Sequence, residues 1–126
     1  MKTATMFLAV SMLAVGSAHA ATDWSTHARN AVETARLSGE ASRQALALVD
    51  TAMRKAHDPA AAAVAAYVVL ECLFPDQEPA LVAELAVSLS HYPETQEKAD
   101  ALAHGRRVAT AMLRSSATTC GGSLPE

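Results

Sequence analysis

The sequence predicts an all-α protein, a small single-domain bundle of four or five helices with one disulfide, preceded by a signal-peptide helix. Alanine is the commonest residue, and it has the highest helix propensity of all residues. Aromatic residues make up 4% of the chain, and β-branched residues do not alternate as they would in strands. A core of small side chains buries little area per residue, so a covalent cross-link is expected to support it.

The first twenty residues have the pattern of an export signal. Lys2 supplies a positive start, Met6–Val15 is apolar, and Ala18-His19-Ala20 matches the small-x-small cleavage pattern. An N-terminal membrane anchor is the alternative, but the apolar run is shorter than the roughly 20 residues that a spanning helix needs. We therefore expect cleavage after Ala20, which leaves a periplasmic or secreted domain of residues 21–126 without a membrane span.

The next segment carries two helical patterns at once. Mostly small residues recur at heptad spacing from Trp24 to Ala56, and charges of alternating sign cover the opposite side. Both patterns continue through Ser38-Gly39, which favours one long helix over residues 23–55, bent at Gly39, over two helices that meet there. The small residues permit close approach of another helix and also suit association into a homodimer.

The middle of the chain shows clear helix boundaries. Asp58 and Pro59 are typical of a helix start, and the nearly all-apolar run Ala60–Phe74 predicts a central buried helix. Pro75 ends that helix, and the next one begins at Pro79 after a short turn.

Two further helices are expected after this turn. The helix that begins at Pro79 is expected to bury one face, and Glu84 is expected to point away from that face. The buried face comprises Leu81, Val82, Leu85, Leu89 and Tyr92. The sequence His91-Tyr92-Pro93 ends this segment, the last helix begins near Glu94, and residues 115–126 are expected to form an irregular tail.

The chain has two cysteines, Cys72 and Cys120. In an oxidising compartment such a pair most simply forms one disulfide, and antiparallel helices would return Cys120 to the end of the bundle that carries Cys72. A nucleophilic cysteine would need a neighbouring histidine, and a zinc site would need four closely spaced ligands. Neither pattern surrounds Cys72, so the disulfide is the preferred interpretation.

Composition and motifs point away from catalysis and from nucleic acid. The chain contains no G-x-S-x-G, G-x-G-x-x-G, Walker or C-x-x-C-H motif, so no catalytic, cofactor-binding or metal site is predicted. The formal net charge of −3 argues against nucleic acid as a partner. Acidic residues occur from Asp58 to Glu97 without a single Lys or Arg, and they either balance the basic flanks within the fold or face a basic partner.

The segment from Leu81 to Cys120 combines a Leu-rich helix, the sequence SLSHYPE at residues 88–94, and an Ala/Leu helix that leads to a cysteine. It resembles the C-terminal half of the small periplasmic immunity proteins of type VI secretion amidase effectors. Ala66-Tyr67-Val68 is similar to a small-Tyr-aliphatic element of that family. The chain lacks the family's early cysteine, the glycine after the Tyr-aliphatic element and the Phe-Pro before the last cysteine. The residues that match the family are Leu89, Tyr92, Pro93, Glu94 and Cys120.

The resemblance implies a protein without enzymatic activity or cofactor that binds and occludes a toxic effector in the periplasm. Contacts are expected at the turns, where the candidate partner-binding residues are Asp76, Glu78, His91, Tyr92 and Glu94. The alternative function is that of a small envelope stress chaperone or adaptor protein.

Overall fold

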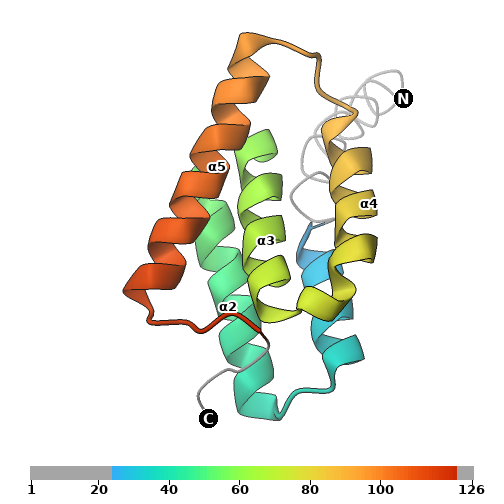
Figure 1. Ribbon diagram of the computed structural model, residues 1–126, viewed down its shortest axis with the longest axis vertical. Coiled ribbons are helices and arrows are strands. Elements are labelled where there is room, and N and C mark those ends of the chain that lie inside the picture. Colours follow the sequence, from blue (N-terminus) through green and yellow to red (C-terminus); the bar gives the residue numbers. More distant parts are fainter. Residues whose placement is uncertain (1–23, 122–126) are drawn as a thin grey trace, which may run out of the picture.

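A computed structural model describes residues 24–121, which consist of helices and their connections, without a strand in this range (Figure 1). The helices, in chain order, are an N-terminal helix covering residues 24–35, α2 (Gly39–Ala56), α3 (Pro59–Leu73), the short 3-10 helix η1 (Pro75–Gln77), α4 (Glu78–Leu89) and α5 (Gln96–Ser115). The predicted all-α fold with one disulfide is confirmed. The expected signal peptide and its cleavage site lie outside the described residues.

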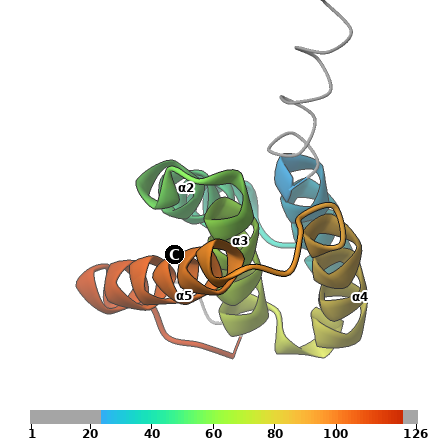
Figure 2. The ribbon, with the colours of Figure 1, turned by 90° about the horizontal axis from the view of Figure 1, so that it is seen from above.

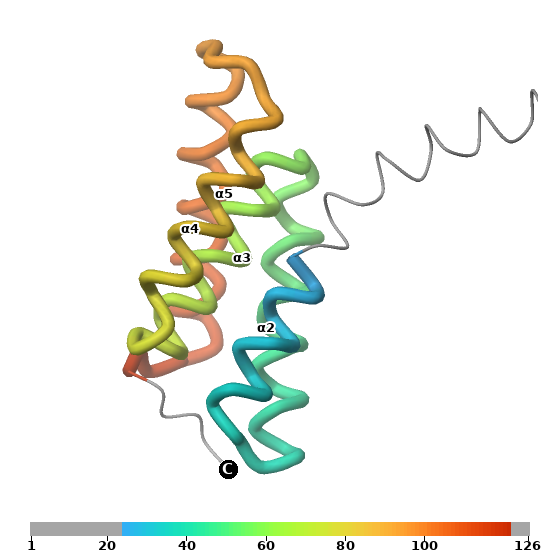
Figure 3. The backbone as a smooth tube through the Cα atoms, turned by 90° about the vertical axis from the view of Figure 1, so that its right-hand side faces the viewer, coloured from blue at the N-terminus to red at the C-terminus, as the bar shows by residue number. Residues whose placement is uncertain are grey.

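The long helix predicted over residues 23–55 is wrong, because the chain reverses direction near Gly39. Helical structure stops at residue 35, and Arg36 adopts a positive φ of 54°. Ser38 then caps α2 by accepting a hydrogen bond from the amide of Ala41. The N-terminal helix and α2 therefore form an antiparallel hairpin (Figure 3).

The small-residue pattern that suggested a continuous helix is satisfied separately by each arm of this hairpin. Most of its members on both arms are buried in the same hydrophobic core, whereas Ala35 and Ser42 near the reversal are half-buried and Ser38 is exposed. The seam is thus occupied inside the domain and is not a free surface for a homodimer. The buried members are Trp24, Ala28, Ala31, Ala45, Val49, Ala52 and Ala56.

Helix α3 lies at the centre of the bundle, with α2 and α5 on one side and the N-terminal helix and α4 on the other (Figure 2). Its start matches the prediction, since the Asp58 carboxylate accepts hydrogen bonds from the amides of Ala60 and Ala61 and Pro59 is the first helical residue. The helix ends at Leu73, directly before Phe74 and Pro75. Most of its residues are buried, as an apolar helix surrounded by neighbours should be.

Helix α5 crosses α3 at very short range around Gly105. A Cβ atom built on Gly105 would lie 2.3 Å from the carbonyl oxygen of Ala61, which belongs to the α3 backbone. Ala109 is fully buried close to this crossing. Glycine inside a helix normally weakens it, but here the absent side chain lets the two backbones approach each other.

Helix α4 packs with most of its predicted face, since Leu81 is buried and Leu85, Leu89 and Tyr92 are half-buried, but two of its residues differ from the prediction. Leu81 is its only buried residue, while Val82, assigned to the buried face from the sequence, is 45% exposed. Glu84 does not point away from the bundle, because its carboxylate lies 2.6 Å from the Nδ1 atom of His27. The inward face of α4 is therefore partly polar, and the N-terminal helix supplies the partners.

The second polar contact of this face involves Trp24, the only tryptophan of the chain. Its indole Nε1 donates a hydrogen bond of 3.0 Å to the hydroxyl of Ser88, and that hydroxyl donates to the carbonyl oxygen of Glu84. The ring of His27 packs edge-on against the indole at 5.2 Å between ring centres. Because Trp24 is 1% exposed, Ser88 satisfies a donor that solvent hardly reaches.

Substitution of Ser88 by alanine is expected to destabilise the domain. The buried indole donor of Trp24 would lose its partner, which should lower the free energy of unfolding by about 1–2 kcal/mol. Urea unfolding followed by tryptophan fluorescence measures this loss. Ser90→Ala is the matched control, since the hydroxyl of Ser90 is exposed and bonds only to its own helix end, so its effect should stay within about 0.5 kcal/mol. Equal stability of the two variants would contradict the structural role of Ser88.

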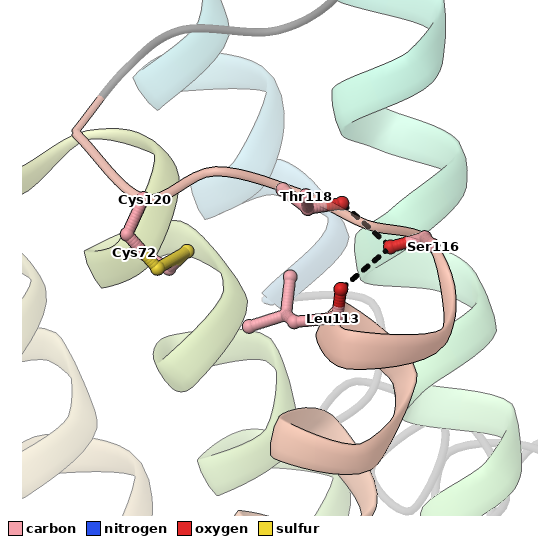
Figure 4. Close-up of a disulfide and its surroundings, with 5 residues drawn as sticks. All are labelled: Cys72, Leu113, Ser116, Thr118 and Cys120. Atoms are coloured by element: carbon pink, nitrogen blue, oxygen red, sulfur yellow. Dashed lines mark hydrogen bonds between the residues drawn. A yellow bond between two sulfur atoms is a disulfide. The ribbon is translucent and has the colours of Figure 1, made fainter.

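The chain beyond α5 returns to α3 and is fixed there by the disulfide (Figure 4). Helix α5 ends at Ser115, and the amide of Thr118 donates to the carbonyl oxygen of Leu113. Cys120 is bonded to Cys72 near the end of α3, and the amide of Gly121 donates a 2.7 Å hydrogen bond to the Cys72 carbonyl. The predicted disulfide is thus confirmed, together with the antiparallel topology from which it was inferred.

Candidate functional site

The five candidate partner-binding residues form two groups at opposite ends of α4. Asp76 and Glu78 lie in η1 and at the start of α4, while His91, Tyr92 and Glu94 lie in the connection to α5. The 12 residues of α4 separate the groups by about 18 Å at 1.5 Å per residue. The structure therefore does not bring all five together into one compact cluster.

The group before α4 is acidic and open to solvent. Asp76 and Glu78 are both exposed, and neither forms an ion pair within the described part of the chain. Gln77 between them holds the turn in place, because its side-chain amide donates to the carbonyl oxygen of Ala31 on the N-terminal helix. The two carboxylates are consequently presented by an anchored turn and are free to meet an external group.

The negative charge at this end extends onto α3. Burial raises the pKa of Tyr67 above its ordinary value of 10.0, and the charges of Glu71 and Glu78 raise it further. A hydrogen bond to Glu71 acts in the same direction, whereas Arg106 on α5 opposes the shift. Tyr67 thus lies near the carboxylates of Glu71, on α3, and Glu78, at the start of α4.

The group after α4 is partly used by the fold itself. Lys98 binds both the Glu94 carboxylate and the carbonyl oxygen of Tyr92, and its side chain is only 9% exposed. Burial, followed by the charge of Asp58, raises the pKa of Tyr92 above its ordinary value. His91 is exposed. Tyr92 is therefore half-buried in the connection to α5, whereas His91 and Glu94 are exposed.

Between the two groups runs an apolar surface that the sequence interpretation missed. The residues of α4 that face away from the bundle are exposed and recur at i, i+3, i+4, i+7 and i+8. Val82 is 45% exposed and Val87 is 64% exposed, and within residues 24–121 they are the only large hydrophobic side chains with such exposure. We call this surface the α4 stripe; its members are Pro79, Val82, Ala83, Ala86 and Val87.

The position of α4 explains why this surface is uncovered. Helix α4 forms an outer edge of the bundle in two perpendicular views (Figures 1 and 2). It packs against α3 and η1, and polar contacts join it to the N-terminal helix, but extensive packing against α5 is absent within the described residues. Within residues 24–121, the outward side of α4 therefore has no neighbouring helix.

The described residues offer no metal centre. Nowhere in residues 24–121 do three or more His, Cys, Asp or Glu side chains gather in a way that could hold a metal ion. Both cysteines are bonded to each other, so neither thiol is available as a nucleophile or ligand. None of the helices in this range has the length and apolar character needed to cross a membrane.

Comparisons of the chain with protein-family models, with curated proteins and with solved structures find no match.

Proposed function

We propose that the protein is an exported, non-enzymatic binding protein whose role is to bind and occlude a toxic effector. The observation that carries this proposal is the α4 stripe, because the largest exposed apolar side chains of the described domain, Val82 and Val87, both belong to it. Contiguous apolar surface on a soluble domain commonly marks a site of protein association. The candidate residues at the two ends of α4 extend this surface with polar groups.

The choice of an effector as the partner depends on the sequence resemblance between residues 81–120 and the immunity proteins of type VI secretion amidase effectors. Immunity by occlusion requires a stable scaffold and a complementary surface, with no chemistry of its own. A small helical core, one disulfide and a rigidly held turn at Gln77 suit that requirement. The signal-peptide pattern suits a site of action in the periplasm, where cell-wall amidases act.

The test is protection of cells against a defined toxin. A type VI secretion amidase effector is directed to the periplasm of a host, with and without this protein, and survival and cell-wall hydrolysis are measured. We expect the protein to restore growth and to inhibit hydrolysis by the purified amidase at equimolar concentration. Absence of both effects, combined with suppression of aggregation of unrelated client proteins, would instead favour the stress chaperone.

A further inference from the structure

We propose that the α4 stripe docks a basic amphipathic helix of the protein partner, an inference that rests on the proposed function and specifies the chemistry of its binding surface. The occupant has an apolar face that contacts Val82 and Val87 and carries Lys or Arg at both ends of that face. Spacing, side-chain size and charge each lead to this occupant.

Spacing and side-chain size select a helix. The members of the α4 stripe lie on one side of α4, as residues three and four apart do. Ala83 and Ala86 are small enough for a second helix backbone to approach closely, and Val82 and Val87 project beside them. A strand would add to a sheet edge, which offers unpaired backbone groups, whereas the backbone of α4 is already bonded within the helix.

Charge selects a basic partner. Asp76 and Glu78 lie at the start of the stripe and Glu97 lies beyond its end; all three are exposed, and none forms an ion pair within residues 24–121. The chain has no Lys or Arg from Asp58 to Glu97, and Lys98, which follows this range, is already paired with Glu94. Arg106 of α5 lies near Tyr67 but forms no ion pair with these three carboxylates. Complementary charges across an interface accelerate association and fix its orientation, so cations on the occupant should face these carboxylates.

The same charges disfavour a second copy of this chain. In a symmetric dimer each surface patch meets its own equivalent, so the acidic ends of one stripe would lie against acidic ends of the other. The stripe runs from Pro79 to Val87 and is about 12 Å long. A stable interface buries about 800 Å² on each partner, so contacts must extend beyond the stripe to the acidic residues at its ends. Acidic side chains also oppose binding to an anionic lipid surface.

The test uses a synthetic helical peptide of about 18 residues, long enough at about 27 Å to pass both ends of α4. Its Leu residues follow the i, i+3, i+4, i+7 pattern and its other positions are Lys; the comparison peptide has Glu in place of Lys. Titration calorimetry with the full chain should detect binding of the Lys peptide only. Val87→Lys should weaken this binding at least tenfold, while Ala47→Lys, which adds the same charge to the exposed side of α2, should leave it unchanged.

A second matched pair of variants tests the charges. Glu78→Gln should weaken binding of the Lys peptide about threefold at low salt, an effect expected to fade as salt screens the pair. Glu33→Gln removes an exposed carboxylate from the N-terminal helix and should have no effect. Equal binding of both peptides, no binding of the Lys peptide, or insensitivity to Val87→Lys would overturn the proposal. A dimer in sedimentation equilibrium that Val87→Lys dissociates would overturn it in favour of self-association.

These outcomes are distinguishable from failure of the immunity function. If the protein protects cells from the amidase but the Lys peptide does not bind, the function stands and the α4 stripe is not its binding surface. If the Lys peptide binds through Val87 but protection is absent, the surface stands and the partner is a different basic protein.

Discussion

Replacement of Gly105 by alanine is expected to lower the free energy of unfolding by about 2 kcal/mol, although alanine normally stabilises a helix by about 1 kcal/mol relative to glycine. The added methyl group would lie 2.3 Å from the carbonyl oxygen of Ala61 and 3.0 Å from its carbonyl carbon. Both atoms belong to the backbone of α3 and cannot rotate away. The two helices would have to separate, which would loosen the packing of Ala109 and Met112 along α5.

Gly39→Ala is the matched control for this variant. Gly39 is the first residue of α2, and a Cβ atom there would meet nothing within 4 Å. Its replacement should change stability by less than about 1 kcal/mol, in the stabilising direction, because the unfolded chain loses freedom. Urea unfolding monitored by circular dichroism compares the two variants. A Gly105→Ala protein as stable as the wild type would show that α3 and α5 do not cross as closely as described.

Loss of the disulfide is expected to have the largest effect on stability. Cys72 and Cys120 are separated by 48 residues, and the loop-entropy relation for a loop of this size gives about 4 kcal/mol. Small domains are commonly stable by roughly 5–15 kcal/mol, so the cross-link would account for a large share. The reduced chain should also lose the hydrogen bond between Gly121 and the Cys72 carbonyl, which forms where the chain is tied to α3.

Urea unfolding of the oxidised protein, of the protein in excess dithiothreitol and of the double variant Cys72→Ala/Cys120→Ala measures this contribution. The reduced protein and the double variant should unfold at similar, lower urea concentrations, and the reductant should have no effect on the variant. Hydrogen exchange should show the earliest loss of protection at Gly121, whose amide bonds to α3, and at Thr118, whose amide bonds to the end of α5. Coincident unfolding curves with and without reductant would contradict a stabilising role.

Features that depend on neighbouring residues could be predicted from the sequence. Asp58 caps α3, Pro59 begins it and Pro75 follows its end, because capping and proline geometry act within a few residues. The pairing of Cys72 with Cys120 could also be inferred, since alternating helix directions place both at one end of the bundle.

Features that depend on distant residues could not be predicted in this way. The small-residue pattern continues through Ser38 because both arms of the hairpin face one core, so periodicity did not mark the reversal that Ser38 caps. Helix α4 is apolar on nearly all sides, and its orientation is set by Trp24 and His27, which contact Ser88 and Glu84 from 57 or more positions away. The close contact at Gly105 likewise involves Ala61, on a different helix.

The candidate site was predicted only at its ends for the same reason. Acidic and aromatic residues in turns are commonly accessible to a partner, and Asp76 and His91 are exposed as expected. Val82 and Val87 were expected in the core or passed over, because apolar residues in a helix are usually assigned to packing. The spacing of Pro79, Val82, Ala83, Ala86 and Val87 places these residues on one side of a helix. The sequence does not indicate whether that side is buried, and the position of the N-terminal helix shows that it faces outward.

The single buried residue of α4 has a consequence for motion. Proteins open in parts, and the parts that open most readily are those with the least buried apolar surface. Detachment of α4 would expose Leu81 and the contacts of Trp24, whereas detachment of α3 would expose nearly the whole core. With α3 and the end of α5 held together by the disulfide, α4 is the element that can shift or rotate on the domain while the remaining helices keep their native packing.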